Sequence, residues 1–119
     1  MKRTLHIEVS TLEESLDQFG DYLQRTIQGE TTAPYSGIGF ESIKSLFSTL
    51  SPKRLELIEQ LKRHGPMTVY ALAKRLGRDY KNVYTDVKAL EQWSVIERDE
   101  QDCVQVPWDE IDLKIPLAA

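Results

Sequence analysis

The sequence has little of what a disulfide scaffold, a zinc site or a membrane protein needs. Cys103 is the only cysteine among 119 residues, which excludes an internal disulfide framework and fits a reducing compartment. The two histidines, His6 and His64, are far apart, so a Cys/His zinc site is nearly excluded. No apolar run approaches the roughly 20 residues that span a membrane, and charges near the start argue against a secretion signal. We expect a cytoplasmic protein with one domain and a short accessory arm.

Enzyme motifs are also lacking. The sequence has no P-loop, dinucleotide-binding fingerprint or metalloprotease helix. The pair Gly37 and Gly39 is too short to cradle a phosphate, and a helix start explains the adjacent carboxylates Glu13 and Glu14. Cys103 is better interpreted as an ordinary strand residue than as a redox sensor. We therefore expect no catalytic residues, no metal ligands and no cofactor.

The net charge of −4 hides an uneven distribution. Residues 1–50 carry four basic and seven acidic side chains, residues 51–98 carry ten and six, and residues 99–119 carry one and six. A basic block between acidic flanks is common in small DNA-binding domains with an interaction arm and tail. Ordinary solvated surfaces whose charges happen to cluster give the same profile, so charge alone leaves both interpretations open.

Hydrophobic periodicity predicts the order of the elements. Residues 5–9 alternate as in a half-buried strand, and an apolar stripe predicts a helix over 10–27. A glycine-rich segment at 29–39 predicts a linker, with a short extended piece at 38–40. Capping signals and apolar stripes predict helices at 41–50, 51–64, 68–76 and 79–93, a hairpin with strands at 95–98 and 103–106, and a last strand at 111–115.

This order predicts a mainly α protein with a small β component (α+β), namely a winged helix-turn-helix with an N-terminal strand–helix arm. The predicted parts are an oligomerisation arm (1–30), a linker (31–40), a winged helix-turn-helix DNA-binding domain (41–106) and an acidic C-terminal strand or tail (107–119). In this geometry the helix at 79–93 enters the major groove of DNA.

The helix at 79–93 has two distinct faces at about 100° per residue. Its core face consists of Val83, Val87 and Leu90. Asp86 lies beside that face and is interpreted as a partner for a nearby base within the domain. The opposite face presents donors suited to phosphates and base edges, flanked by Asn82 and Tyr84. The residues of this outward face are Lys81, Thr85, Lys88 and Gln92.

The docking geometry adds contacts outside this helix. Thr68, at a helix start, and Arg78, in the turn, suit phosphates, and Arg98 at the base of the hairpin is placed to reach a minor groove. The hairpin tip is acidic and would be repelled by phosphate, so only Gln101 there is a weak candidate. The predicted DNA-binding residues are Thr68, Arg78, Lys81, Asn82, Tyr84, Thr85, Lys88 and Arg98. The simpler alternative is that the cations among them are ordinary surface residues.

The stretch Gly77–Val83, with residues 71–76 before it and 86–91 after it, resembles a prokaryotic family of winged-helix, MarR-like transcriptional regulators. The resemblance implies a DNA-binding regulator, and it also implies that some members act as antitoxins beside small toxin genes. Two features depart from the family pattern. Trp93-Ser94 stands where such proteins often have a glycine, and the hairpin is acidic rather than basic.

We therefore expect a sequence-specific regulator of transcription that binds double-stranded DNA, and we expect a repressor because nothing resembles an activation surface. One alternative is a DNA-binding antitoxin. The other is a winged-helix protein-interaction module without DNA binding, which the acidic hairpin favours. The apolar segments 5–9, 12–27 and 111–115 need burial, either within one chain or, as we favour, in a homodimer interface that spaces two recognition helices by ~34 Å.

Overall fold

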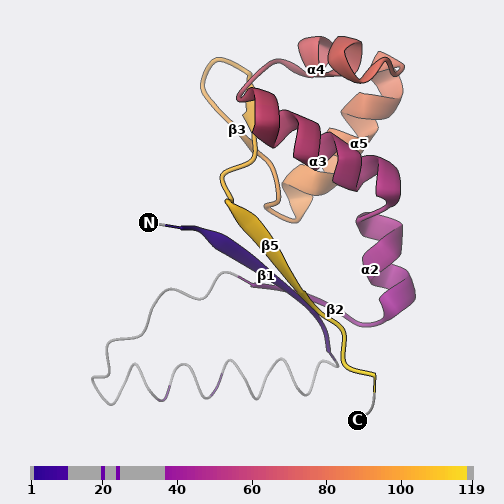
Figure 1. Cartoon of the computed structure of the whole chain (residues 1–119), viewed down its shortest axis with the longest axis vertical. Coiled ribbons are helices and arrows are strands. Elements are labelled where there is room, and N and C mark those ends of the chain that lie inside the picture. The colour runs from indigo at the N-terminus through magenta and orange to yellow at the C-terminus, as the bar shows by residue number, and fades with distance from the viewer. Residues whose placement is uncertain (1, 11–19, 21–23, 25–36, 118–119) are drawn as a thin grey trace.

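The computed structural model of the protein describes residues 2–10, 20, 24 and 37–117 (Figure 1). The elements it describes are β1 (Thr4–Val9), β2 (Gly37–Phe40), α2 (Ile43–Thr49), α3 (Pro52–His64), α4 (Val69–Leu76), α5 (Tyr80–Gln92), β3 (Glu97–Arg98), β4 (Val104–Gln105) and β5 (Glu110–Lys114). The predicted α+β class is confirmed. The helix predicted at 10–27 lies outside the described residues except at positions 10, 20 and 24, and so does most of the linker predicted at 31–40.

Three strands form a parallel sheet in the order β2-β1-β5, which lies below α3, α4 and α5 and beside α2 in Figure 1. β2 occupies the short extended piece expected at 38–40, and β5 the strand expected at 111–115. Ile7 lies opposite Ile38 on one side and Leu113 on the other, so these apolar side chains share a face. Leu5 and Ile7 are buried in this single chain. Part of the apolar surface that we expected a homodimer interface to bury is therefore buried within a single chain.

Asp109 fixes the start of the pairing between β1 and β5. The Arg3 backbone N–H donates to Asp109 Oδ2 at 2.7 Å, and the Asp109 N–H donates to the Arg3 carbonyl at 2.8 Å. The first of these bonds holds the pKa of the Asp109 carboxyl below its usual range. The two strands, distant in sequence, are thus joined in register by side-chain and backbone contacts.

The helices begin and end where the sequence signals place them. The side chains of Ser51 and Thr68 cap α3 and α4 by accepting from the backbone N–H groups of Arg54 and Ala71. Gly77 ends α4 with φ 64°, in the left-handed region that glycine tolerates best. The predicted core face of α5 is confirmed, since Val83, Val87 and Leu90 are all fully buried.

A short hairpin follows α5 and packs back toward α4. β3 and β4 pair in antiparallel fashion, and Val104 also bridges to Met67, just before α4. The Met67 and Val104 backbones exchange two hydrogen bonds, of 3.2 and 2.8 Å. The start of α4 is therefore tied to the hairpin by these backbone hydrogen bonds.

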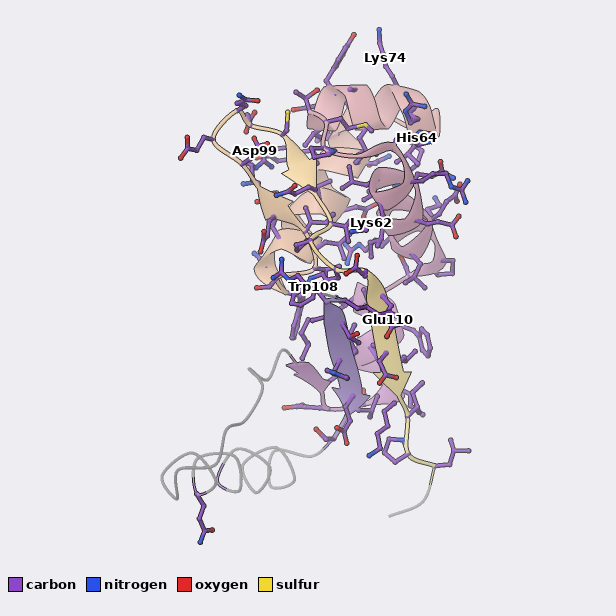
Figure 2. All side chains as sticks on the ribbon, turned by 60° about the vertical axis from the view of Figure 1, so that its left-hand side comes forward. Lys62, His64, Lys74, Asp99, Trp108 and Glu110 are labelled. Carbon is purple, nitrogen blue, oxygen red and sulfur yellow. The ribbon has the colours of Figure 1, made fainter. Side chains whose placement is uncertain are left out.

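Tryptophans join the helical unit to the parallel sheet. Trp108, just before β5, is buried, and its Nε1–H donates to the Ser94 carbonyl at 3.0 Å. The rings of Phe40, on β2, and Trp93, at the end of α5, lie 4.5 Å apart between centroids. Figure 2 shows Trp108 at the junction of the two parts.

Ser94 stands after α5, where related proteins often have a glycine, and it adopts a backbone conformation that favours glycine. Its φ of 62° lies in the left-handed region, which costs a residue with a Cβ roughly 1 kcal/mol. We expect Ser94→Gly to raise the free energy of unfolding by about 0.5 kcal/mol, because relief of this strain exceeds the added entropy of the unfolded chain. Urea denaturation followed by circular dichroism measures the change. Ser94→Ala keeps the Cβ and should give no gain, so an equal gain in that variant would contradict the explanation.

Candidate nucleic-acid interface

The outward face of α5 is exposed to solvent, as the helical spacing of its residues predicts. The opposite face of α5 packs into the core through Val83, Val87 and Leu90. The turn that begins at Gly77 determines how α5 is oriented relative to α4. The Thr85 hydroxyl donates to the Lys81 carbonyl at 3.0 Å, one turn back along the helix. The exposed side chains of the predicted set on this helix are Lys81, Asn82, Tyr84, Thr85 and Lys88, and Gln92 is exposed as well.

The free charges on the surface of α4 and α5 are positive. Within the described ranges, no ion pair joins any of the exposed cations of the two helices, which are Lys74, Arg75, Lys81 and Lys88. The acidic side chains within the two helices, Asp86 and Glu91, are paired with arginines. Asp79, just before α5, is exposed, and its carboxylate accepts from the Asn82 N–H at the start of the helix. The surface of these two helices is therefore cationic although the chain carries a net charge of −4.

Asp86 lies between two arginines inside the helical unit. Its Oδ1 accepts from Arg54 Nε at 3.0 Å and its Oδ2 accepts from Arg78 Nη2 at 2.7 Å. Arg54 also donates from Nη1 to the Thr49 carbonyl at 3.0 Å. The interpretation of Asp86 as a partner within the domain is confirmed. Arg78, predicted to contact phosphate, faces inward with its Nη2 committed to this carboxylate.

Arg98 is held in the same way at the base of the hairpin. Its guanidinium donates to Glu91 Oε1 and to Asp102 Oδ1, each at 2.7 Å. The hydrogen bond to Glu91, followed by that to Asp102, raises the pKa of Arg98 above its ordinary value. The structure thus places this predicted minor-groove contact between α5 and the hairpin loop, with its charge compensated.

The hairpin loop is acidic and locally ordered. The Asp99 side chain accepts from the backbone N–H groups of Gln101 and Cys103, at 2.8 and 3.0 Å. Figure 2 shows Asp99 in this loop, and Figure 1 shows the loop on the side where α4 begins, away from the turn between α4 and α5.

Thr68 serves first as a cap. Its hydroxyl accepts from the Ala71 N–H at 3.2 Å, and the residue is exposed at the start of α4. An exposed cap of this kind leaves backbone N–H groups of the first turn directed outward, where an anion is stabilised.

Sequence reasoning missed two exposed aromatic residues beside Tyr84. The rings of Tyr80 and Tyr84, one turn apart on α5, are stacked with centroids 6.1 Å apart, and Tyr70 of α4 lies 6.5 Å from Tyr80. The spacing of four residues between Tyr80, Tyr84 and Lys88 was the available signal, because such residues share one side of a helix. Tyr70 carried no comparable signal, since its position depends on how α4 packs against α5.

Metal and membrane sites find no support in the described part of the chain. No group of three or more potential metal ligands occurs there. None of its helices combines the length and apolarity that crossing a bilayer requires.

The fold and surface define a small α+β protein in which α4 and α5 are joined by a tight turn, followed by a hairpin, with exposed cations on both helices. The family model described as HVO_A0114 matches residues 49–113, more than half of the chain, and the chain therefore belongs to this family. The match runs from the end of α2 into β5. No curated protein and no solved structure matches the chain.

Proposed function

We propose that this protein is a winged-helix, MarR-like regulator that binds double-stranded DNA with α5. The supporting observation is the set of four exposed cations on α4 and α5 that have no ionic partner among the described residues. Phosphate contacts by such cations provide affinity, and the polar side chains between them are suited to base edges. The helix order, with a hairpin tied to the entry of α4, supports the same geometry.

The proposal covers a cytoplasmic repressor that acts as a homodimer by occupying a promoter. Of the predicted contacts, Lys81, Asn82, Thr85 and Lys88 are the exposed polar residues of α5, and Tyr84 lies beside them. Thr68 supports a phosphate contact at the start of α4. Arg78 and Arg98 contribute by orienting the turn and the hairpin, because both are engaged with carboxylates.

Charge reversal at Lys81 tests the proposal. We expect fluorescence anisotropy to show preferential binding of a duplex from upstream of this protein's own gene over a scrambled duplex. Lys81→Glu should weaken that binding about tenfold, roughly 1.4 kcal/mol, and should lower the salt slope by about one because a phosphate contact is lost.

Lys53→Glu provides the matched control for this experiment. Lys53 is exposed at the start of α3, off the surface of α4 and α5, and the substitution changes the net charge equally. Equal weakening by both variants would mean that only the total charge matters. Equal affinity for both duplexes would contradict sequence-specific recognition.

The acidic loop supports a second candidate, a winged helix that binds a protein. Asp99, Glu100 and Asp102 are exposed together at the hairpin tip, where they suit a basic partner. An antitoxin would combine this contact with DNA binding. Absence of binding to either duplex near physiological salt would make the protein-interaction module the leading explanation.

A further inference from the structure

We propose that the exposed tyrosines of α4 and α5 form a binding site for an unpaired nucleic-acid strand, a ligand beyond the duplex proposed above. The tyrosine row consists of Tyr70, Tyr80 and Tyr84. Neighbouring rings are 6.5 and 6.1 Å apart between centroids, with interplanar angles of 51° and 30°. The row thus crosses from one helix of the helix-turn-helix to the other.

The tyrosine row is not required by the hydrophobic core. Tyr70, Tyr80 and Tyr84 are 59%, 49% and 39% exposed. The inner faces of the same helices are filled by other side chains, which are Val69, Leu72, Ala73, Val83, Val87 and Leu90. The parts of these rings that neither a neighbouring ring nor a lysine covers are open to solvent, where a further aromatic group can stack.

A cation stands at each end of the tyrosine row. Lys74 Nζ lies 4.9 Å from the centroid of Tyr70, and Lys88 Nζ lies 5.6 Å from the centroid of Tyr84. Figure 2 shows Lys74 pointing away from the body of the protein at the outer side of α4. Ammonium groups flanking aromatic faces match a ligand with alternating phosphates and bases. A purely apolar protein partner would gain nothing from these cations.

The spacing of the rings favours an unpaired strand over a duplex. Successive bases within a duplex strand lie roughly 3.4 Å apart and cover one another's faces. Rings 6.1 and 6.5 Å apart cannot follow such a stack, but they can each receive a base of an extended strand. Stacking on aromatic side chains contributes roughly 1–3 kcal/mol per base and tolerates any sequence.

The strand site and the proposed duplex site overlap only in part. Tyr84, Lys74 and Lys88 belong to both sites, whereas Tyr70 and Tyr80 belong to the strand site alone. Lys81 and Thr85 lie on the outward face predicted to meet the duplex. Strand binding is therefore measurable without any duplex, and its failure would leave the duplex experiment with Lys81→Glu unaffected.

Substitution of the central ring tests the proposal. Fluorescein-labelled oligothymidylate and oligouridylate of about ten nucleotides are titrated with the full chain, and anisotropy reports binding. We expect Tyr80→Ala to weaken binding roughly 5- to 100-fold. Tyr80→Phe keeps the ring and should bind within about twofold of the parent chain. Binding of either oligonucleotide supports the site, and the two arms distinguish a DNA strand from an RNA strand.

Phe47→Ala is the matched control, because Phe47 is a similarly exposed aromatic residue on α2, outside the tyrosine row. It should leave binding unchanged, and circular dichroism checks that every variant is folded. Three results would overturn the proposal. These are no binding of either oligonucleotide at micromolar protein, no effect of Tyr80→Ala, or an equal loss in Tyr80→Phe, which would indicate a hydroxyl contact instead of stacking.

Discussion

Asp86→Ala should lower the free energy of unfolding by about 3–5 kcal/mol, because it leaves Arg54 and Arg78 largely buried without their shared carboxylate. The Asp86 side chain is only 14% exposed and accepts from both guanidinium groups. Arg54 comes from α3 and Arg78 from the turn before α5, so the carboxylate holds three parts of the helical unit together. Urea denaturation followed by circular dichroism measures the loss.

Asp102→Ala is the appropriate comparison for this loss. Asp102 accepts from Arg98 at 2.7 Å, the same distance as between Asp86 and Arg78, but its side chain is 78% exposed. Solvent screening limits such a pair to about 0–1 kcal/mol. If the two variants lost similar amounts of unfolding free energy, burial would not explain how strongly Asp86 stabilises the fold through Arg54 and Arg78.

Trp108→Ala should cost about 3–5 kcal/mol of unfolding free energy, as is usual when a large buried aromatic side chain is removed. The substitution also removes the hydrogen bond to the Ser94 carbonyl and the contact with the Arg3 guanidinium, which lies 5.0 Å from the ring centroid. We expect the amides of β1 and β5 to exchange with solvent faster, because Trp108 connects the sheet to the helices. Hydrogen exchange and urea denaturation measure the two effects.

Trp93→Ala is the control for Trp108→Ala. It shows how much stability is lost when a tryptophan that is less buried is removed from the same junction. Trp93 packs against Phe40 with the two rings tilted and is partly exposed, so we expect a smaller cost of about 1–2 kcal/mol. If Trp93→Ala cost as much as Trp108→Ala, the buried position of Trp108 would not be what stabilises the junction.

Local signals in the sequence predicted the helical unit well. Ser51, Thr68 and Gly77 mark helix boundaries through hydrogen bonds and backbone angles that depend on the residue type itself. The apolar spacing on α5 likewise identified which side chains are buried, and it placed Asp86 beside them. These features are encoded within a few neighbouring residues, so a single sequence is sufficient to predict them.

Features that depend on distant contacts were not predictable in the same way. The alternation in β1 and β5 indicates strands but does not say that the two pair in parallel with each other. The predicted roles of Arg78 and Arg98 assumed exposed guanidinium groups. Each instead meets a carboxylate seven or eight residues away, a pairing set by how α5 packs against the turn and the hairpin.

The central place of β1 in the sheet constrains the order in which the protein can fold during synthesis. Thr4 lies opposite Glu110, a partner 106 residues later in the chain. Helices α3 to α5 are close together in sequence and can assemble while the chain is still being translated. β1 can pair with β5 only after residues 110–114 have been made, so one edge of β1 stays open for pairing until then.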